Sequence, residues 1–202
     1  MQMNLDLKEE TRGEVVEETP KALLQNKKPT VLEEIPEDCV VVDIETTGFS
    51  ATHDSIIEIS ALKIVQGKVQ EEFSSLVKPK KKLPPFISKL TGITPEMVQS
   101  APDIKVVLEK FCNFIQTNPI VGHNIKFDLS FLNKKLEETY EKTLPNDFLD
   151  TLTFARKVYR NLSSHKLTNI ANHLKIDTKN AHRALNDCYM TYKILEDMKG
   201  KL

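Results

Sequence analysis

The sequence lacks a hydrophobic run long enough to cross a membrane. None of its 202 residues falls in a window that approaches the ~20 consecutive apolar residues of a membrane-spanning helix. Its N-terminus, which begins Met-Gln-Met-Asn-Leu-Asp, has neither the basic start nor the apolar stretch of a secretory signal. These absences argue against a membrane or secreted protein, and we expect a cytoplasmic protein without a membrane partner.

Cysteine is scarce as well. The three cysteines, Cys39, Cys112 and Cys188, are far apart and odd in number, and no Cys-x-x-Cys pair or Cys/His cluster is present. Such usage is typical of buried free thiols in a reducing compartment rather than of disulfides. The sequence therefore predicts neither a disulfide framework nor a zinc site.

An excess of positive charge is also missing, since the formal net charge is −1. The charge is unevenly distributed, because residues 1–38 hold ten acids and five bases, whereas the remainder holds 19 acids and 23 bases. If several acids of that remainder bind metal ions, a polyanion meets a more positive surface than the net charge suggests.

The first 37 residues are polar and acidic and show no sustained periodicity. They predict a disordered N-terminal tail over residues 1–37, followed by one domain over residues 38–202. Within the tail, Val31, Leu32 and Ile35 form either a short docking segment or part of a solvated leader.

Hydrophobic periodicity predicts an α/β domain. We expect a central mixed five-stranded sheet, an antiparallel meander followed by parallel strands, flanked by helices. Thr94 is the expected N-cap of a short helix that begins at Pro95. The basic, proline-rich connection over residues 78–85 is either a phosphate contact or a solvated loop. The expected strands are 39–44, 56–65, 69–77, 119–122 and 147–150, and the expected longer helices are 103–116, 124–139, 150–160, 166–174 and 182–199.

Two acids follow the apolar start of the first strand. Asp43 and Glu45 are two residues apart, so in a strand both side chains project from one face. Paired carboxylates repel each other when buried, and the usual partner of such a pair is a hard divalent cation such as Mg²⁺ or Mn²⁺. The alternative is an edge strand whose polar face meets water.

Two further acids lie on largely apolar helices. Asp128 shares a stripe with Phe131, Leu132 and Leu136, which directs it toward the core unless it caps the helix start. Asp187 lies in the last predicted helix, and His182 precedes it by five residues.

Other polar residues receive ordinary interpretations. His53, His165 and His173 read as surface or core residues, and His123 as a structural or capping residue. Glu58, an acid among isoleucines, hydrogen-bonds the backbone or shapes the site, and we leave it outside the ligand set.

Three motifs follow one another within residues 38–199. They are Asp43-Ile44-Glu45-Thr46-Thr47-Gly48, Gly122-His123-Asn124-Ile125-Lys126-Phe127-Asp128 and His182-Arg183-Ala184-Leu185-Asn186-Asp187. Together they resemble the DEDDh-type 3′–5′ exonucleases, the DnaQ-like family, which includes the epsilon proofreading subunit and the PolC-type exonuclease domain of bacterial DNA polymerase III. The resemblance implies a ribonuclease H-like fold and two ions, Mg²⁺ or Mn²⁺, in each active site.

The same resemblance implies a role for each site residue. Asp43, Glu45, Asp128 and Asp187 bind the metal ions, and His182 acts as the general base in hydrolysis. The last nucleotide is held by two short segments, which are Thr46, Thr47, Gly48 and Phe49 after the first acids, and Thr91, Gly92 and Ile93 further on.

The implied reaction releases nucleoside 5′-monophosphates from the 3′ end of single-stranded DNA or frayed ends, in proofreading, repair or trimming. The Thr46-Thr47-Gly48 turn favours the DNA polymerase-associated branch. A 3′–5′ exoribonuclease is the alternative, and a non-catalytic nucleic-acid-binding adaptor is a third reading. No C-terminal extension or clamp-binding peptide of the epsilon type is visible. A polymerase subunit and a free-standing nuclease therefore both stay open.

Overall fold

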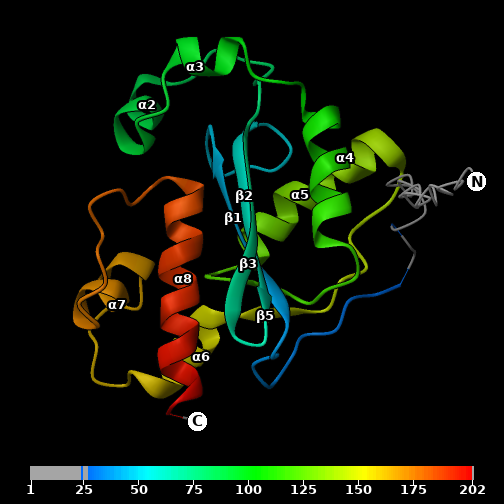
Figure 1. Cartoon of the computed structure of the whole chain (residues 1–202). Coiled ribbons are helices and arrows are strands. Elements are labelled where there is room, and N and C mark those ends of the chain that lie inside the picture. Colours follow the sequence, from blue (N-terminus) through cyan, green and yellow to red (C-terminus); the bar gives the residue numbers. More distant parts are fainter. Residues whose placement is uncertain (1–23, 25–26, 202) are drawn as a thin grey trace, which may run out of the picture.

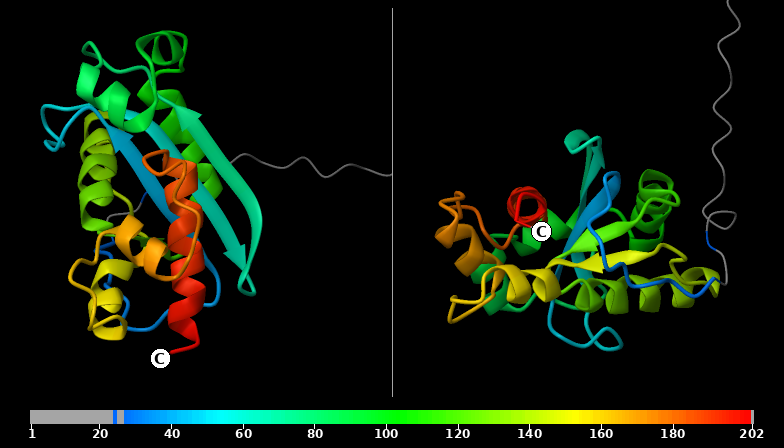
Figure 2. Two further views of the ribbon diagram at one scale, coloured as in Figure 1. Left: turned by 90° about the vertical axis from the view of Figure 1, so that its left-hand side faces the viewer. Right: turned by 90° about the horizontal axis from the view of Figure 1, so that it is seen from below.

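The computed structural model describes residue 24 and residues 27–201. One mixed sheet runs through the middle of the molecule, and helices cover both of its faces (Figures 1 and 2). The strands are β1 (Cys39–Thr46), β2 (Ile56–Val65), β3 (Lys68–Leu76), β4 (Ile120–Gly122) and β5 (Phe148–Asp150). The helices are α2 (Pro85–Thr91), α3 (Pro95–Gln99), α4 (Ile104–Ile115), α5 (Lys126–Tyr140), α6 (Thr151–Val158), α7 (Leu167–His173) and α8 (Ala184–Lys199).

The sheet has the strand order β3-β2-β1-β4-β5. β1 pairs antiparallel with β2, and β2 with β3, whereas β4 is parallel to both β1 and β5. The predicted mixed five-stranded sheet, with a meander first and parallel strands after it, is therefore confirmed. β1 lies at the centre of the sheet, and its C-terminal end lies beside the start of β2.

β1 is apolar on both faces because helices bury both. Val40 and Val42 pack in one core with Phe111 of α4 and Phe131 of α5. Val41 packs in a second core, on the α8 side of the sheet. Alternation along the strand therefore directs Asp43 and Glu45, which share a face with Val41, toward α8.

The structure follows most predicted boundaries to within two residues. Thr94 caps α3 as predicted, since its Oγ1 accepts a hydrogen bond from the Met97 N–H at 3.3 Å. Helix α2 is missing from the prediction, which treated Pro84 and Pro85 as part of a connection. Pro85 occupies the first turn of this short helix, where its missing N–H leaves no intrahelical bond unmade.

Residues 27–32 lie along the outer edge of β5. The Leu32 N–H donates to the Phe148 carbonyl at 2.8 Å, and the Phe148 N–H donates to the Thr30 carbonyl at 2.9 Å. Lys27 forms an ion pair with Asp147 at 3.1 Å. These residues, predicted to belong to a disordered tail, pack against the domain instead. The tail's residues 1–23, 25 and 26 lie outside the described residues, and the domain boundary itself stays a prediction.

The three cysteines are free and buried, which confirms the interpretation of their spacing. Burial raises the pKa of the Cys39 and Cys112 thiols to about 12, so both stay protonated at neutral pH and react poorly. Within the part of the chain that the structure describes, no helix combines the length and apolar character needed to span a membrane.

Candidate active site

Three carboxylates meet where β1 ends against α8. Asp43 and Glu45 come from β1 and Asp187 from the first turn of α8, and each offers an oxygen atom within 4.8 Å of the others. Asp187 is buried, and the two strand acids are half-buried. The structure therefore brings together three of the four acids that the sequence predicts for metal binding.

Asp128 approaches β1 from the opposite side. It lies in the first turn of α5 with only 5% of its surface exposed. Its Oδ1 accepts a hydrogen bond from the Ile44 N–H at 3.1 Å. Asp128 is outside the three-residue group, yet its charge raises the pKa of Asp43 more than the charge of any other acid does. The side chain faces the sheet, as its apolar stripe predicts.

Burial and mutual repulsion keep these acids from ionising at their ordinary pH. Burial, and then the charge of Asp128, raises the pKa of Asp43 well above its usual value. Burial raises the pKa of Glu45 and of Asp128 to about 8 in each case, and the pKa of Asp187 to about 7. A cluster that desolvates its own charges in this way is a favourable place for a cation.

The donor set fits a hard divalent cation. All four acids offer carboxylate oxygens, the ligands that Mg²⁺ and Mn²⁺ prefer. Among the described residues, the cation beside them is Arg183, which is held in an ion pair with Glu58 at 2.8 Å. The acids around Asp43 thus lack a side-chain counter-ion of their own.

His182 lies two residues before the start of α8. Its backbone N–H donates to Asp187 Oδ1 at 3.2 Å, and its side chain is exposed to solvent. Its φ of 66° lies in the left-handed region, which a histidine adopts only where its surroundings hold it. The turn therefore fixes the histidine next to the acidic cluster.

Glu58 of β2 anchors the start of α8. Its carboxylate accepts two hydrogen bonds from the Arg183 guanidinium, at 2.8 and 3.2 Å, and one from the Ala184 N–H at 3.0 Å. Glu58 is 2% exposed. The sequence signals Glu58 as an acid among isoleucines, but nothing in it identifies Arg183 as the partner, because 125 residues separate the two.

In the turn after β1, the hydroxyl groups of Thr46 and Thr47 form hydrogen bonds with backbone groups of the protein itself. Thr46 donates its hydroxyl to the Gly48 carbonyl at 2.6 Å, and the Thr47 hydroxyl accepts from the Ser55 N–H at 2.9 Å. A Cβ on Gly48 would lie 2.5 Å from the Asp54 carboxylate, which explains the glycine. Phe49 is 90% exposed and offers the turn's free apolar surface.

The second predicted nucleotide-binding segment packs in part into a small core. Ile93 is fully buried with Ile57 and Ile87, and Thr91 is buried and hydrogen-bonds its own helix. Nucleotide binding by Thr91, Gly92 and Ile93 stays a prediction. Gly92, with φ of 70°, ends α2 in the left-handed conformation that favours glycine.

His123 has the structural role that the sequence suggests. Its Nε2 lies 2.8 Å from the His165 carbonyl, and its Nδ1 lies 3.0 Å from Thr151 Oγ1. Because a carbonyl only accepts, Nε2 carries the proton of the neutral ring. The ring thereby connects the end of β4 to the start of α6 and to the loop before α7.

An exonuclease family model, RNase T, matches residues 40–195, which is most of the chain. The chain belongs to this family. This family is that of the DnaQ-like 3′–5′ exonucleases, and the matched range contains all four acids and His182. The resemblance carried by the three motifs is thus confirmed at the level of the family.

This exonuclease has relatives among replication proteins. It is 42% identical over 178 residues to the PolC-type DNA polymerase III of Clostridium perfringens, covering 86% of this chain but 12% of that protein. It is 39% identical over 163 residues to the DNA polymerase III epsilon subunit of Aquifex aeolicus, covering 79% of this chain and 81% of the subunit. The exonuclease therefore spans about an eighth of its PolC-type relatives.

Solved structures agree with the fold. Exonuclease X in complex with 5′ overhanging duplex DNA is 25% identical with a TM-score of 0.67, covering 80% of this chain and 91% of that one. Escherichia coli Exonuclease I in complex with a dA16 oligonucleotide is 19% identical with a TM-score of 0.72, covering 82% of this chain and 41% of that one. The predicted ribonuclease H-like exonuclease fold is therefore confirmed.

Proposed function

We propose that this exonuclease removes nucleotides one at a time from the 3′ end of DNA and releases nucleoside 5′-monophosphates. The observation that carries the proposal is the desolvated carboxylate cluster at the C-terminal end of β1. The names of the relatives, which include a DNA polymerase subunit and an exonuclease bound to DNA, favour DNA over RNA. Single strands and frayed ends are the proposed substrates, because their 3′ ends can reach the acids unpaired.

Four acids of the chain would hold two Mg²⁺ or Mn²⁺ ions. Asp43, Glu45 and Asp187 would supply ligands from the side of β1 that faces α8, and Asp128 would supply a ligand from α5. When bound, such ions activate water and stabilise the charge that develops on the leaving oxygen. The oxygen-only donor set supports this assignment, as does the finding that no cation among the described residues forms an ion pair with Asp43.

The chain's own residues supply the proton transfer and the positioning. His182, fixed beside Asp187 by its backbone hydrogen bond, would take the proton of the attacking water. Phe49 would stack against the terminal base or sugar, since its ring is exposed and contacts Phe127 edge-on with centroids 6.4 Å apart. Asp128 would keep its oxygen oriented through the Ile44 N–H.

The direct test compares substrates. Purified protein with Mg²⁺ is incubated with 5′-labelled DNA and RNA oligonucleotides of one sequence, and the products are resolved with time. We expect stepwise shortening of DNA from the 3′ end and loss of activity with chelator. Much faster turnover of RNA would replace the DNA assignment, and no turnover of either would support the adaptor.

Two variants test the assigned roles. We expect Asp43→Asn to abolish turnover and to remove the rise in melting temperature that Mg²⁺ gives the parent protein. We expect His182→Ala to lower kcat by ~10²–10⁴-fold, while the Mg²⁺-induced rise persists. His53→Ala, which alters an exposed histidine outside the cluster, is the matched control. Equal activity of the His182 and His53 variants would contradict the general-base assignment.

A DNA polymerase is the proposed protein partner, and the cytoplasm the proposed compartment. The first rests on the names of the relatives, and the second on three free, buried thiols. Co-purification of the full chain with the replicative polymerase of its own source would test the partner. A chain that elutes alone in that experiment would favour a free-standing nuclease.

A further inference from the structure

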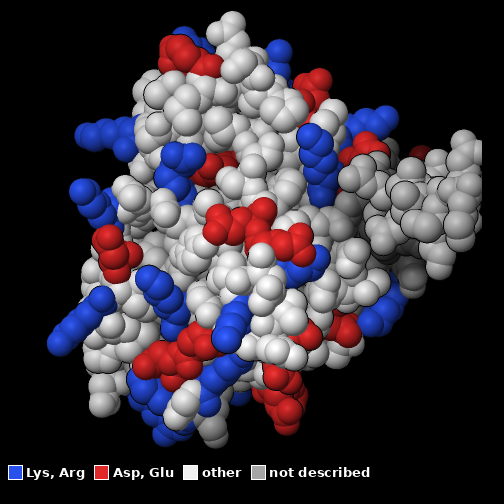
Figure 3. Space-filling model, in the orientation of Figure 1, with Lys and Arg blue, Asp and Glu red and all other residues white. Residues whose placement is uncertain are grey.

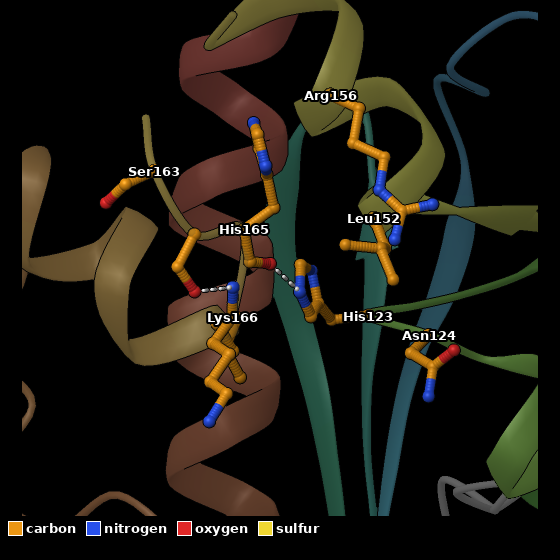
Figure 4. Close-up of a pocket in the computed structure, with 9 residues that line it drawn as sticks. His123, Asn124, Leu152, Arg156, Ser163, His165 and Lys166 are labelled. Carbon is orange, nitrogen blue, oxygen red and sulfur yellow. Dashed lines mark hydrogen bonds between the residues drawn. The ribbon is translucent and has the colours of Figure 1, made fainter. Parts of the chain in front are cut away.

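A cavity lies near the acidic cluster, between the ends of β4 and β5 and the loop that leads into α7. Its volume is about 580 Å³, and Figure 4 shows the side chains that surround it. β4 is parallel to β1, with Val121 opposite Val41. His123 therefore leaves β4 at the same edge of the sheet at which Asp43 lies in β1. The cavity is lined by His123, Asn124, Leu152, Arg156, Ser163, Ser164, His165, Lys166 and Leu167.

Two cations line this cavity without a carboxylate partner. Arg156 on α6 and Lys166 at the start of α7 are both exposed, and neither makes an ion pair with any residue that the structure describes. Figure 4 shows them on either side of the His123 ring. The Asp150 carboxylate forms no ion pair with either cation, and its Oδ1 accepts hydrogen bonds from the Asn124 and Leu152 N–H groups. A ligand with negative charge would therefore meet two available cations.

The histidines of the cavity are structural. Burial, and to a lesser degree the positive charge of Arg156, lowers the pKa of His123, so its ring is neutral. It donates from Nε2 to the His165 carbonyl, and the His165 ring lies 3.0 Å from the Tyr159 carbonyl and donates to it. These bonds hold the loop before α7 in place and present Lys166 at its end. Hydrogen bonds of the two histidines thus hold the cavity wall in place, whereas Arg156 and Lys166 form no ion pair with a described residue.

We propose that this cavity binds an internucleotide phosphate of the substrate strand, one or more nucleotides upstream of the bond that is cleaved. The inference rests on the proposed function, because a strand whose 3′ end lies at the acids can place its next phosphates only on neighbouring surface. The chain's net charge is −1, and basic and acidic side chains intermingle on the face in Figure 3. Phosphate binding by this protein must therefore depend on a few local cations, because it has no broadly positive surface of the kind that many nucleic-acid-binding proteins use.

The test removes the two charges separately. Arg156→Gln and Lys166→Gln are compared with Arg160→Gln, a matched control that removes the same charge just outside the cavity lining. KM is measured for a dT12 oligonucleotide and for the p-nitrophenyl ester of thymidine 5′-monophosphate, which has no upstream phosphate. Binding of dT12 without divalent metal is followed by fluorescence anisotropy over a range of salt concentrations.

We expect each cavity variant to raise KM for dT12 about 5- to 10-fold and to reduce the salt slope of binding by about 0.7. The effect on the ester should be less than about 2-fold, because the lost contact is to a phosphate that the ester lacks. Effects on dT12 no larger than those of Arg160→Gln, or equal losses on both substrates, would overturn the subsite. If the parent hydrolyses neither substrate, the proposed function fails, and anisotropy still decides whether the cavity binds the strand.

Discussion

At the scale of single residues, the acids that make the site chemically useful also make it unstable without metal. Asp43, Glu45, Asp128 and Asp187 are desolvated beside one another, and burial is the largest cause of each raised pKa. Folding therefore brings together charges that the unfolded chain keeps apart in water. A bound cation would reverse this cost, which couples metal binding to the stability of the fold.

The pKa shifts predict how stability varies with pH in the absence of metal. Unfolded carboxyl groups lose their protons near pH 4, whereas folded Glu45 and Asp128 hold theirs to about pH 8. The folded state then binds more protons over this range, so the free energy of unfolding falls as pH rises from about 4 to about 8. Urea unfolding in chelator across this range measures the slope, and Mg²⁺ should recover the loss near pH 8.

Asp128→Asn tests the origin of that slope. The amide oxygen can still accept from the Ile44 N–H, but the repulsive charge is gone. We expect the variant to unfold with a free energy about 1–2 kcal/mol higher at pH 8 in chelator, with a shallower pH dependence. Glu137→Gln, an exposed acid of the same helix, is the control and should change neither. A less stable variant would show that charge repulsion is not the dominant effect.

At the scale of elements, the N-terminus of α8 determines the position of Asp187 in the acidic cluster. α8 carries Asp187 in its first turn, and the helix start is bound to β2 through Glu58, Arg183 and the Ala184 N–H. The N-cap residue, Arg183, makes no capping hydrogen bond from its side chain to the first turn of this helix. The buried carboxylate of Glu58 therefore takes the place of a local cap and fixes the helix relative to the sheet.

Removing the guanidinium should affect both stability and metal binding. Arg183→Met leaves Glu58 buried without its ion partner, and we expect a loss of about 2–3 kcal/mol in the free energy of unfolding. The Mg²⁺-induced rise in melting temperature should also shrink, because Asp187 loses its position.

Lys199→Met is the control at the other end of the same helix. Its pair with Glu196 spans 3.4 Å between partly exposed groups, so we expect a loss of less than about 0.5 kcal/mol. Equal losses in the two variants, measured by urea unfolding, would show that the Glu58 contact does not fix the helix.

At the scale of the whole molecule, a segment from the N-terminal region extends the sheet. Residues 30–32 form a parallel bridge with Phe148 of β5, and this covers part of an edge that would otherwise be exposed. Leu32 and Ile35 pack against the core on the α8 side of the sheet. Of the two readings that the sequence leaves open for Leu32 and Ile35, this contact favours the docking segment over the solvated leader.

Leu32→Ala measures what that contact contributes. We expect a loss of about 1–2 kcal/mol in the free energy of unfolding, since a half-buried leucine loses most of its apolar contact area. Val31→Ala, at a neighbouring residue with 52% of its surface exposed, should change stability by less than about 0.5 kcal/mol. Indistinguishable variants would mean that residues 30–35 rest on the domain without stabilising it.

The sequence by itself determined the strands, most helices and the acids of the site. Period-two and period-3.6 patterns follow from local geometry, so β1 and the longer helices are visible within windows of ten to fifteen residues. The acids are visible for a related reason, because Asp43 and Asp128 interrupt apolar patterns that a solvated carboxylate would avoid. The three motifs added the family, which the exonuclease family match confirms.

Only the tertiary structure decided which side chains keep free surface and which distant segments meet. Of the residues predicted to contact the nucleotide, Ile93 is buried in a small core, whereas Phe49 is exposed. The Glu58–Arg183 pair and the cation-lined cavity each join segments that lie far apart in the chain. Local patterns cannot specify such contacts, because they depend on how the whole sheet brings the helices together.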